Sequence, residues 1–293
     1  MVKKGFRKYT FFVFFLCISG IFPKDCLPQE KNTILTTGPE KGSLVIVGGG
    51  ATELIINKFL ELAGGLDAPV VIIPTAGGLD TYGDNAANMG IFRSVGAKNI
   101  TVLHTNDKQI ANSDSFVTPL LNAKGVWFGG GRQWRLVDAY GDTKTEEMFW
   151  EVLNRGGVIG GSSAGATIQG SYLARGDTKN NQIMTGDHEE GFGFIKNIAI
   201  DQHVLTRNRQ FDMFDILKKH QELLGISIDE QTAAIVQGNI FEVIGESYVI
   251  VYDGSFWSGE GWDKKTLPEK DRLFYFLRNG DRYDLLNRKV IEK

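Results

Sequence analysis

Residues 156–166 read GGVIGGSSAGA, in which a short apolar run leads into two serines with glycines on both sides. Glycine tolerates positive φ and lets two backbones approach closely, so this composition predicts a tight chain reversal. The segment GSSAG, residues 161–165, fits the G-x-S-x-G pattern of a strand-to-helix turn that exposes a serine at the edge of a sheet. In this register Ser163 is the candidate nucleophile. A phosphate-binding glycine turn, or glycines required only for close packing, are the open alternatives.

The sequence around this turn alternates between short apolar runs and amphipathic stretches. The runs lack polar alternation, as strands covered on both faces do; they are residues 44–47, 70–74, 100–104, 125–128 and 157–160. Helices are predicted between them at 52–63, 85–95, 133–140 and 145–154, and after the serines at 164–174. This alternation predicts an α/β fold, a doubly wound and mostly parallel sheet with helices on both faces.

The pattern changes in the second half of the chain. A strand is predicted at 199–205, a helix at 211–224, and further strands at 226–230, 232–238, 240–245 and 247–254. Hairpin-like turns at Gly238-Asn239 and Gly245-Glu246 predict mixed or antiparallel strands toward the C-terminus. We therefore expect one hydrolytic α/β domain at 43–254, preceded by a polar linker at 27–42. Residues 255–293 form a C-terminal extension of unknown role.

The N-terminal residues have the features of an export signal. Four basic residues within 3–8 precede an apolar run at 11–22 that contains a small-residue zone at Ser19–Gly20, so residues 1–26 are predicted to be a signal peptide. The run is shorter than the ~20 apolar residues that span a bilayer. The expected location is therefore secreted or periplasmic, and membrane attachment is expected only if Cys17 or Cys26 carries a lipid.

Composition excludes several classes of function. The chain has 293 residues, 42% of them hydrophobic, which is enough for a sizeable core. A net charge of −3 gives no electrostatic footprint for nucleic acid. Both cysteines lie before residue 27, so the body of the chain has no disulfide, thiolate metal site or cysteine nucleophile.

A nucleophilic serine needs a base and a group that orients the base. His203 lies toward the end of the run at 199–205, among other polar groups, and strand ends are where open α/β sheets bind ligands. The other histidines fit this role less well. His220 is expected on a solvated helix face, His104 at the edge of the core and His188 in an exposed loop. For the acid, Asp229 and Glu230 both follow a strand run, and spacing does not choose between them. Asp187 or Asp177 would instead give the chain order of α/β-hydrolases.

Glycines after other strands supply further candidates. The amide of Ala164 can donate to an oxyanion, and the loop after residue 128 offers Gly130 or Gly131 as a second donor. The segment VIVGGGATE at 45–53 invites a dinucleotide-binding interpretation, but Glu53 occupies the third glycine position, so that fingerprint is incomplete.

Taken together, four segments resemble cyanophycinase and its relatives around peptidase E. They are GGSSAGA at 160–166, FGGGRQ at 128–133, DQHVLTRNR at 201–209 and GISIDEQTAA at 225–234, and VIVGGG at 45–50 and VIIPTAGG at 71–78 resemble that family's opening strands. The resemblance covers roughly residues 43–254. It implies a fold similar to class I glutamine amidotransferases, with serine in place of cysteine.

The resemblance also implies roles for individual residues. It gives a triad of Ser163, His203 and Glu230, and so selects Glu230 over Asp229. It places five residues around the substrate: Gln133, Asp201, Gln202, Arg207 and Arg209.

Two positions depart from the family pattern. Arg132 stands where the family has an acid, and Asp212 stands where an arginine is expected. Exchanging arginine for aspartate deletes a bidentate partner for carboxylates. The sequence therefore defines the type of reaction, hydrolysis by a serine nucleophile, better than it defines the substrate.

The sequence thus predicts an exported serine peptidase that needs no metal and no cofactor. The expected substrate is cyanophycin or another β-aspartyl or aspartyl peptide, with the arginines binding carboxylates. Two alternatives remain open: an α/β-hydrolase esterase, and a catalytically inactive exported binding protein on the same scaffold. The oligomeric state is also open, with a homodimer as one option.

Overall fold

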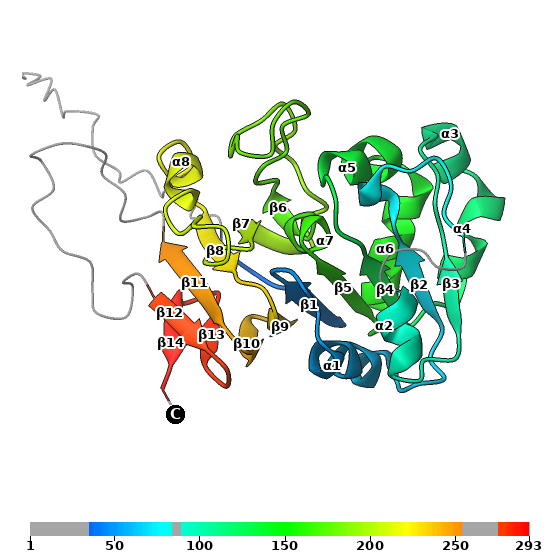
Figure 1. The fold of residues 1–293 in the computed structure, drawn as a ribbon, viewed down its shortest axis with the longest axis horizontal. Coiled ribbons are helices and arrows are strands. Elements are labelled where there is room, and N and C mark those ends of the chain that lie inside the picture. Colours follow the sequence, from blue (N-terminus) through cyan, green and yellow to red (C-terminus); the bar gives the residue numbers. More distant parts are fainter. Residues whose placement is uncertain (1–34, 84–88, 254–274, 293) are drawn as a thin grey trace, which may run out of the picture. The chain divides into compact units, whose positions relative to one another are not determined.

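A computed structural model describes residues 35–83, 89–253 and 275–292. The five apolar runs of the first half form parallel strands in the spatial order β3-β2-β4-β5-β1 (Figure 1). Their bounds are β1 Ser43–Val47, β2 Val70–Ile73, β3 Ile100–Val102, β4 Gly125–Phe128 and β5 Val158–Ser162. The predicted α/β fold class is confirmed.

Strand β1 shows why these runs lack polar alternation. Leu44 and Ile46 point into one hydrophobic core, while Val45 and Val47 point into a second core on the opposite face. Every residue of β1 is buried. A strand covered on both faces has few positions for a polar side chain, so residues 44–47 are continuously apolar, and the buried Ser43 at the start of the strand accepts from Gln237 Nε2.

Helices cover both faces of this sheet, as predicted. One face packs against α1 Glu53–Ala63 and α2 Met89–Ser94. The other face packs against α3 Lys108–Ala111, α4 Asp114–Leu121, α5 Trp134–Tyr140 and α6 Lys144–Asn154. Helices α3 and α4 were not predicted from the sequence. Both begin after a capping side chain, since Asp107 accepts from Gln109 N and Ser113 from Phe116 N.

Two predicted helices are much shorter in the structure. The helix predicted at 164–174 ends early, because α7 comprises only Ala164–Thr167 and Gly170–Tyr172 forms strand β6. Pairing of β6 with β7, Ile195–Gln202, overrides the helical pattern. The helix predicted at 211–224 is reduced to α8, Met213–Leu217, since strand β8 already begins at Leu224.

The C-terminal half extends the large sheet with antiparallel strands, as expected. Strand β9, Thr232–Gln237, pairs antiparallel with β1, and β10, Ile240–Gly245, pairs antiparallel with β9. Beyond β10 lie β13, Arg282–Asp284, and β14, Lys289–Ile291. The complete order is β14-β13-β10-β9-β1-β5-β4-β2-β3.

A second sheet, which the sequence analysis did not separate from the first, carries part of the candidate site. Its order is β12-β11-β8-β7-β6, with β8 Leu224–Ile228, β11 Tyr248–Asp253 and β12 Tyr275–Arg278. Strands β6, β7 and β8 are parallel. One face contributes Ile200 and Ile226 to the core shared with the large sheet, and the other face packs against α8.

The described parts of the predicted linker and C-terminal extension contact the same folded unit. Thr36, within the predicted linker, donates to the Asn197 carbonyl and accepts from Arg288 Nη2 at 3.0 Å. Residues 275–291 supply strands to both sheets. The predicted signal peptide, 1–26, lies outside the described residues. Within the described part of the chain, none of the helices has the length and apolar character needed to cross a membrane.

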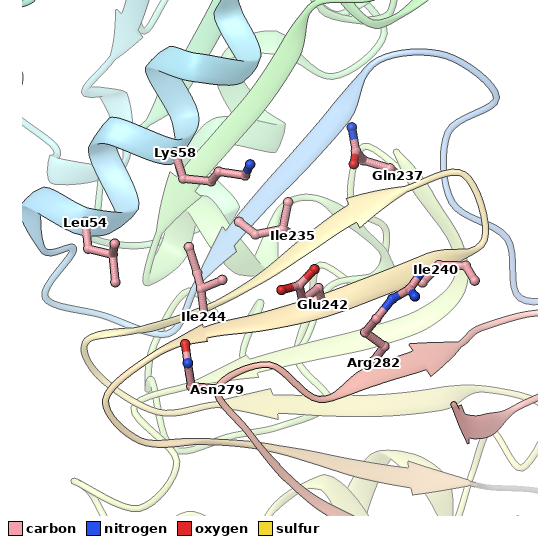
Figure 2. A pocket seen from close by; sticks show the side chains of 9 residues that line it. All are labelled: Leu54, Lys58, Ile235, Gln237, Ile240, Glu242, Ile244, Asn279 and Arg282. Carbon is pink, nitrogen blue, oxygen red and sulfur yellow. The ribbon is translucent and has the colours of Figure 1, made fainter. Parts of the chain in front are cut away.

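A groove of about 600 Å³ lies between α1 and the antiparallel strands of the large sheet (Figure 2). Its walls come from α1, β9, β10, β13 and the turn before β13, through Leu54, Lys58, Ile235, Gln237, Ile240, Glu242, Ile244, Asn279 and Arg282. None of the site residues expected from the sequence lines it.

Candidate active site

Ser163 lies at the turn between β5 and α7, as the G-x-S-x-G pattern predicts. Its φ of 58° and ψ of −114° are unusual for a residue with a side chain. A Cβ added at Gly161 would lie 2.3 Å from the Gly165 carbonyl oxygen, and one at Gly165 would lie 2.1 Å from the Phe128 carbonyl oxygen. Both glycines are therefore required for the close packing of the turn, which presents Ser163 at the strand end.

The structure brings together the three residues of the expected triad. His203 Nε2 lies 2.9 Å from Ser163 Oγ, and His203 Nδ1 lies 2.6 Å from Glu230 Oε1. These side chains follow three different strands, β5, β7 and β8, at their C-terminal ends. The arrangement has the nucleophile–base–acid contacts that acyl transfer requires.

The geometry separates the two carboxylates that spacing left equivalent. Asp229 accepts hydrogen bonds from the backbone of Leu205 and Thr206 and from Ser247 Oγ. Burial opposes the charge of Asp229, but these hydrogen bonds outweigh it and lower the pKa of the carboxyl. Asp229 thus fixes the loop after His203, while Glu230 contacts the imidazole itself.

The carboxylates of the α/β-hydrolase alternative are engaged elsewhere. Asp187 accepts from Thr178 N and Oγ1, and it also contacts His188 Nδ1. Asp177 accepts from the backbone of Lys179 and Asn180. The hydrogen bonds from Thr178 and His188 lower the pKa of Asp187 to about 2. Neither carboxylate contacts His203.

The remaining histidines also have other partners. His104 Nδ1 pairs with Thr75 Oγ1, His188 lies between Asp138 and Asp187, and His220 lies 3.6 Å from Glu222. Among the histidines, all of which lie in the described residues, His203 is the one that forms a hydrogen bond with Ser163.

The glycines after β1 hold the site together rather than binding a dinucleotide. Three successive carbonyls accept from the three segments of the site: Val47 from Ser163 N at 3.0 Å, Gly48 from His203 N at 3.0 Å, and Gly49 from Gln231 N at 2.8 Å. A Cβ at Gly48 would lie 2.2 Å from the Ile228 carbonyl oxygen. The sequence signal VIVGGG therefore reflects close backbone approach.

Gly49→Ala tests this packing. The added methyl group would lie 2.4 Å from both Cε1 and Nδ1 of the His203 ring and 3.1 Å from Glu230 Cγ. We expect displacement of the imidazole to lower kcat by on the order of 10²-fold. Gly90→Ala in α2 is the control, because its Cβ would meet nothing within 4 Å. Equal turnover by the two variants would contradict the steric account.

The glycine loop after β4 lies beside Ser163. A Cβ at Gly130 would lie 3.9 Å from Ser163 Oγ, whereas one at Gly131 would lie 2.0 Å from the Ala76 carbonyl oxygen. Gly130 is thus the glycine that faces the nucleophile, and Gly131 packs on the neighbouring turn. Ala164 N–H, at the start of α7, makes no backbone hydrogen bond within the described residues. Ala164 and Gly130 are the better placed pair for an oxyanion.

The surroundings of His203 favour its neutral form. Burial of the ring is the largest cause, followed by the positive charge of Arg207, and together with Arg209 they lower the pKa of His203 below 6.5. The contact with Glu230 acts in the opposite direction without reversing the result. At neutral pH the imidazole is therefore ready to accept a proton from Ser163.

This shift predicts the pH dependence of turnover. Since only neutral His203 can act as base, kcat/KM should rise as pH increases through a pKa below 6.5 and then stay level. Arg207→Gln removes a nearby cation that lowers the pKa of His203, so it should move the midpoint upward. The exposed Lys196→Gln serves as a control with no expected shift. An unchanged midpoint in the Arg207 variant would refute the assigned cause.

The five expected substrate-binding residues fall into two groups. Gln133 and Asp201 are fully buried: Gln133 Nε2 donates to the carbonyls of Ala174 and Arg175, and Asp201 pairs with Arg175. The second group lies close to His203 in the sequence: Gln202 directly precedes it, and Arg207 and Arg209 lie in the loop after it. Arg209 is 3% exposed and donates to the backbone and side-chain oxygens of Gln202, while Arg207 is exposed.

Arg175 is a residue that sequence reasoning missed. It is fully buried, and its guanidinium contacts both Asp201 and Asp212. A single arginine in loop-like sequence carries no local signal of such a role.

Across the described residues, no cluster of three or more histidine, cysteine, aspartate or glutamate side chains could hold a metal ion.

The fold and the serine-centred contacts define the class as a serine hydrolase. The model of peptidase family S51 matches residues 44–244. The chain therefore belongs to peptidase family S51, the cyanophycinase and peptidase E family of serine peptidases.

Relatives agree with this assignment. A cyanophycinase from Geminocystis herdmanii is 32% identical over 265 residues, which cover 85% of this chain and 95% of the relative. A cyanophycinase from Synechococcus elongatus is 27% identical, covering 91% of this chain and 86% of the relative. The chain is thus a cyanophycinase-like peptidase.

Solved structures share the fold. A peptidase from an acI-B1 Actinobacterium matches with a TM-score of 0.63 at 22% identity, covering 84% of this chain and 98% of that one. A peptidase E protein from Listeria monocytogenes matches with a TM-score of 0.52 at 18% identity, covering 71% and 100%.

Proposed function

We propose that this chain is an exported serine peptidase that hydrolyses cyanophycin (multi-L-arginyl-poly-L-aspartate) or related β-aspartyl and aspartyl peptides through an acyl-enzyme. The observation that carries the proposal is the continuous contact from Ser163 Oγ through His203 to Glu230. Cyanophycinase relatives at 27–32% identity support the substrate class.

The proposed reaction begins when Ser163 Oγ attacks the amide carbonyl carbon while His203 Nε2 takes the hydroxyl proton. Glu230 holds the Nδ1–H and stabilises the imidazolium. The amides of Ala164 and Gly130 donate to the oxyanion. His203 then protonates the leaving amine, and the C–N bond breaks to leave an ester on Ser163.

Hydrolysis of this ester completes the cycle. Water attacks the ester carbonyl as His203 takes its proton, and the acid product leaves as Ser163 regains its hydrogen. No step requires a metal or a cofactor.

Charges beside the triad support an acidic substrate. Arg209 is buried, yet it donates only to the neutral oxygens of Gln202, and no carboxylate of the described residues forms an ion pair with Arg207 or Arg209. The nearby carboxylates of Asp201 and Asp212 already pair with Arg175, so Arg209 has no ion-pair partner of its own among the described residues. A carboxylate can receive two parallel bonds from a guanidinium. A substrate carboxylate would supply that partner.

The alternatives from the sequence gain no support from this geometry. An α/β-hydrolase esterase would use Asp177 or Asp187, and both are bonded away from His203. A binding protein without activity would not require the Ser163–His203 and His203–Glu230 contacts, which need two residues with left-handed φ, Ser163 and His203.

The direct test is product analysis by mass after incubation with cyanophycin and with β-aspartyl and α-aspartyl dipeptides. We expect cleavage of at least one acidic substrate, and losses in kcat of about four to six orders of magnitude in Ser163→Ala and His203→Ala. Glu230→Gln should cost about 10³- to 10⁴-fold.

Two controls make this result specific. Ser162→Ala changes the neighbouring serine, and Asp187→Asn changes the acid of the esterase alternative; both should retain turnover. Cleavage by Ser163→Ala, or loss of activity in Asp187→Asn with retention in Glu230→Gln, would overturn the proposal.

Export is proposed from the pattern of residues 1–26. Expression of the full chain should yield a processed protein outside the cytoplasmic membrane, with the N-terminus determined by mass. Replacing the basic residues within 3–8 by glutamine should slow processing, because they orient the signal. Recovery of the unprocessed chain in the cytoplasm alone would contradict export.

A further inference from the structure

Arg175 combines three features that the proposed reaction does not explain. It is charged yet fully buried, and its φ of 58° lies in the left-handed region, which residues with side chains rarely adopt. Buried charges and strained backbone both persist only where the surrounding structure enforces them. These features indicate that Arg175 has a specific role in the structure.

The guanidinium of Arg175 holds two carboxylates at once. Its Nε donates to Asp201 Oδ1 at 2.7 Å and its Nη2 to Asp201 Oδ2 at 3.0 Å, while Nη2 also lies 2.5 Å from Asp212 Oδ2. Nη1 donates to the Asn181 carbonyl at 3.0 Å. The bidentate bond fixes the orientation of the Asp201 carboxylate.

From Asp201 the hydrogen bonds continue to the substrate side of the site. Asp201 Oδ1 also accepts from Gln202 N at 2.9 Å, and Gln202 Oε1 accepts from Arg209 Nη1 at 3.0 Å. Arg209 thus takes its position from Gln202, Gln202 from Asp201, and Asp201 from Arg175. His203 is the next residue along the chain.

The backbone of Arg175 connects this network to the other side of the nucleophile. Its carbonyl accepts from Gln133 Nε2 at 2.9 Å, and Gln133 follows the glycine loop that contains Gly130. Arg175 therefore lies at the junction between the oxyanion side and the histidine side of the site.

We propose that Arg175 is a positioning residue for substrate binding: through Asp201 and Gln202 it holds Arg209 in place to bind a carboxylate of an acidic peptide. The inference rests on the proposed function for the identity of the substrate. Arg175 supplies the buried counter-charge to Asp201, and Asp212, which stands where the family resemblance predicts an arginine, accepts from the same guanidinium.

The test measures binding separately from catalysis. In the Ser163→Ala background, an aspartyl-aspartate dipeptide is titrated by calorimetry with and without Arg175→Lys. Lysine keeps the charge, so Asp201 is not left unpaired, but it cannot form the bidentate bond. We expect binding to weaken on the order of 10- to 100-fold, while Arg155→Lys, a distant arginine that donates to two carbonyls, has no effect.

A second measurement shows whether the catalytic contacts survive. With Ser163 present, the rate of labelling by an uncharged alkyl fluorophosphonate should change less than about twofold in Arg175→Lys, since the Ser163–His203–Glu230 contacts do not include Arg175. Parallel loss of labelling and binding would mean a general structural role and would overturn the inference. Unchanged dipeptide binding would do so as well.

A double-mutant cycle covers the case in which Arg175→Lys folds poorly. Gln202→Met removes the bond from Arg209 Nη1 to Gln202 Oε1, whereas the Gln202 carbonyl can still accept from Arg209 and the Arg175 ion pairs stay in place. Because both substitutions act through one chain of hydrogen bonds, their effects on dipeptide binding should be strongly non-additive. Additive losses, or normal binding by Gln202→Met, would contradict the proposal.

These results are distinguishable from failure of the proposed function. A protein that binds the dipeptide in an Arg175-dependent manner but hydrolyses no acidic peptide would refute the peptidase assignment and retain the inference. A Ser163→Ala protein that does not bind aspartyl-aspartate, while the wild type still hydrolyses cyanophycin or a β-aspartyl peptide, would refute the inference alone.

Discussion

Three consecutive carbonyl oxygens at the end of β1 fix the geometry on which the site depends. Val47, Gly48 and Gly49 receive the backbone N–H groups of Ser163, His203 and Gln231, which come from distant parts of the sequence. These backbone hydrogen bonds fix the distances between the three segments of the chain. The side chains of Ser163, His203 and Glu230 are therefore held within contact distance of one another. Glycine is required because a Cβ at Gly49 would occupy the space of the imidazole.

Electrostatics around this frame divides the site into two halves. On one side Glu230 orients a histidine that burial and Arg207 keep neutral. On the other side the buried pair of Arg175 and Asp201 leads through Gln202 to Arg209. A buried ion pair is weak evidence for stability, since desolvation offsets the attraction between the two charges. The bidentate bond between Arg175 and Asp201 nevertheless has a well-defined geometry, and it orients the neighbouring polar groups.

Much of this could be predicted from the sequence because its causes are local. Continuous apolar runs identified β1 to β5, and glycines around Ser163 identified the turn. The contact of His203 with Glu230 instead of Asp229 depends on how the loop after β8 twists, which spacing does not encode. The helix predicted at 164–174 was wrong because pairing of β6 with β7 is a long-range effect. For the same reason the sequence predicted strands near β7, β8 and β11 but not their separation into a second sheet, and it gave no indication of the role of Arg175.

In the proposed reaction one hydroxyl, that of Ser163, performs the hydrolysis after activation by one imidazole, that of His203. The most direct measurement is peptide mapping by mass spectrometry after stoichiometric reaction with a fluorophosphonate, combined with assay of the modified protein on the acidic substrate it cleaves. The account predicts a single adduct on Ser163 and complete loss of hydrolysis. An adduct at another residue, or full activity retained after Ser163 is modified, would contradict it.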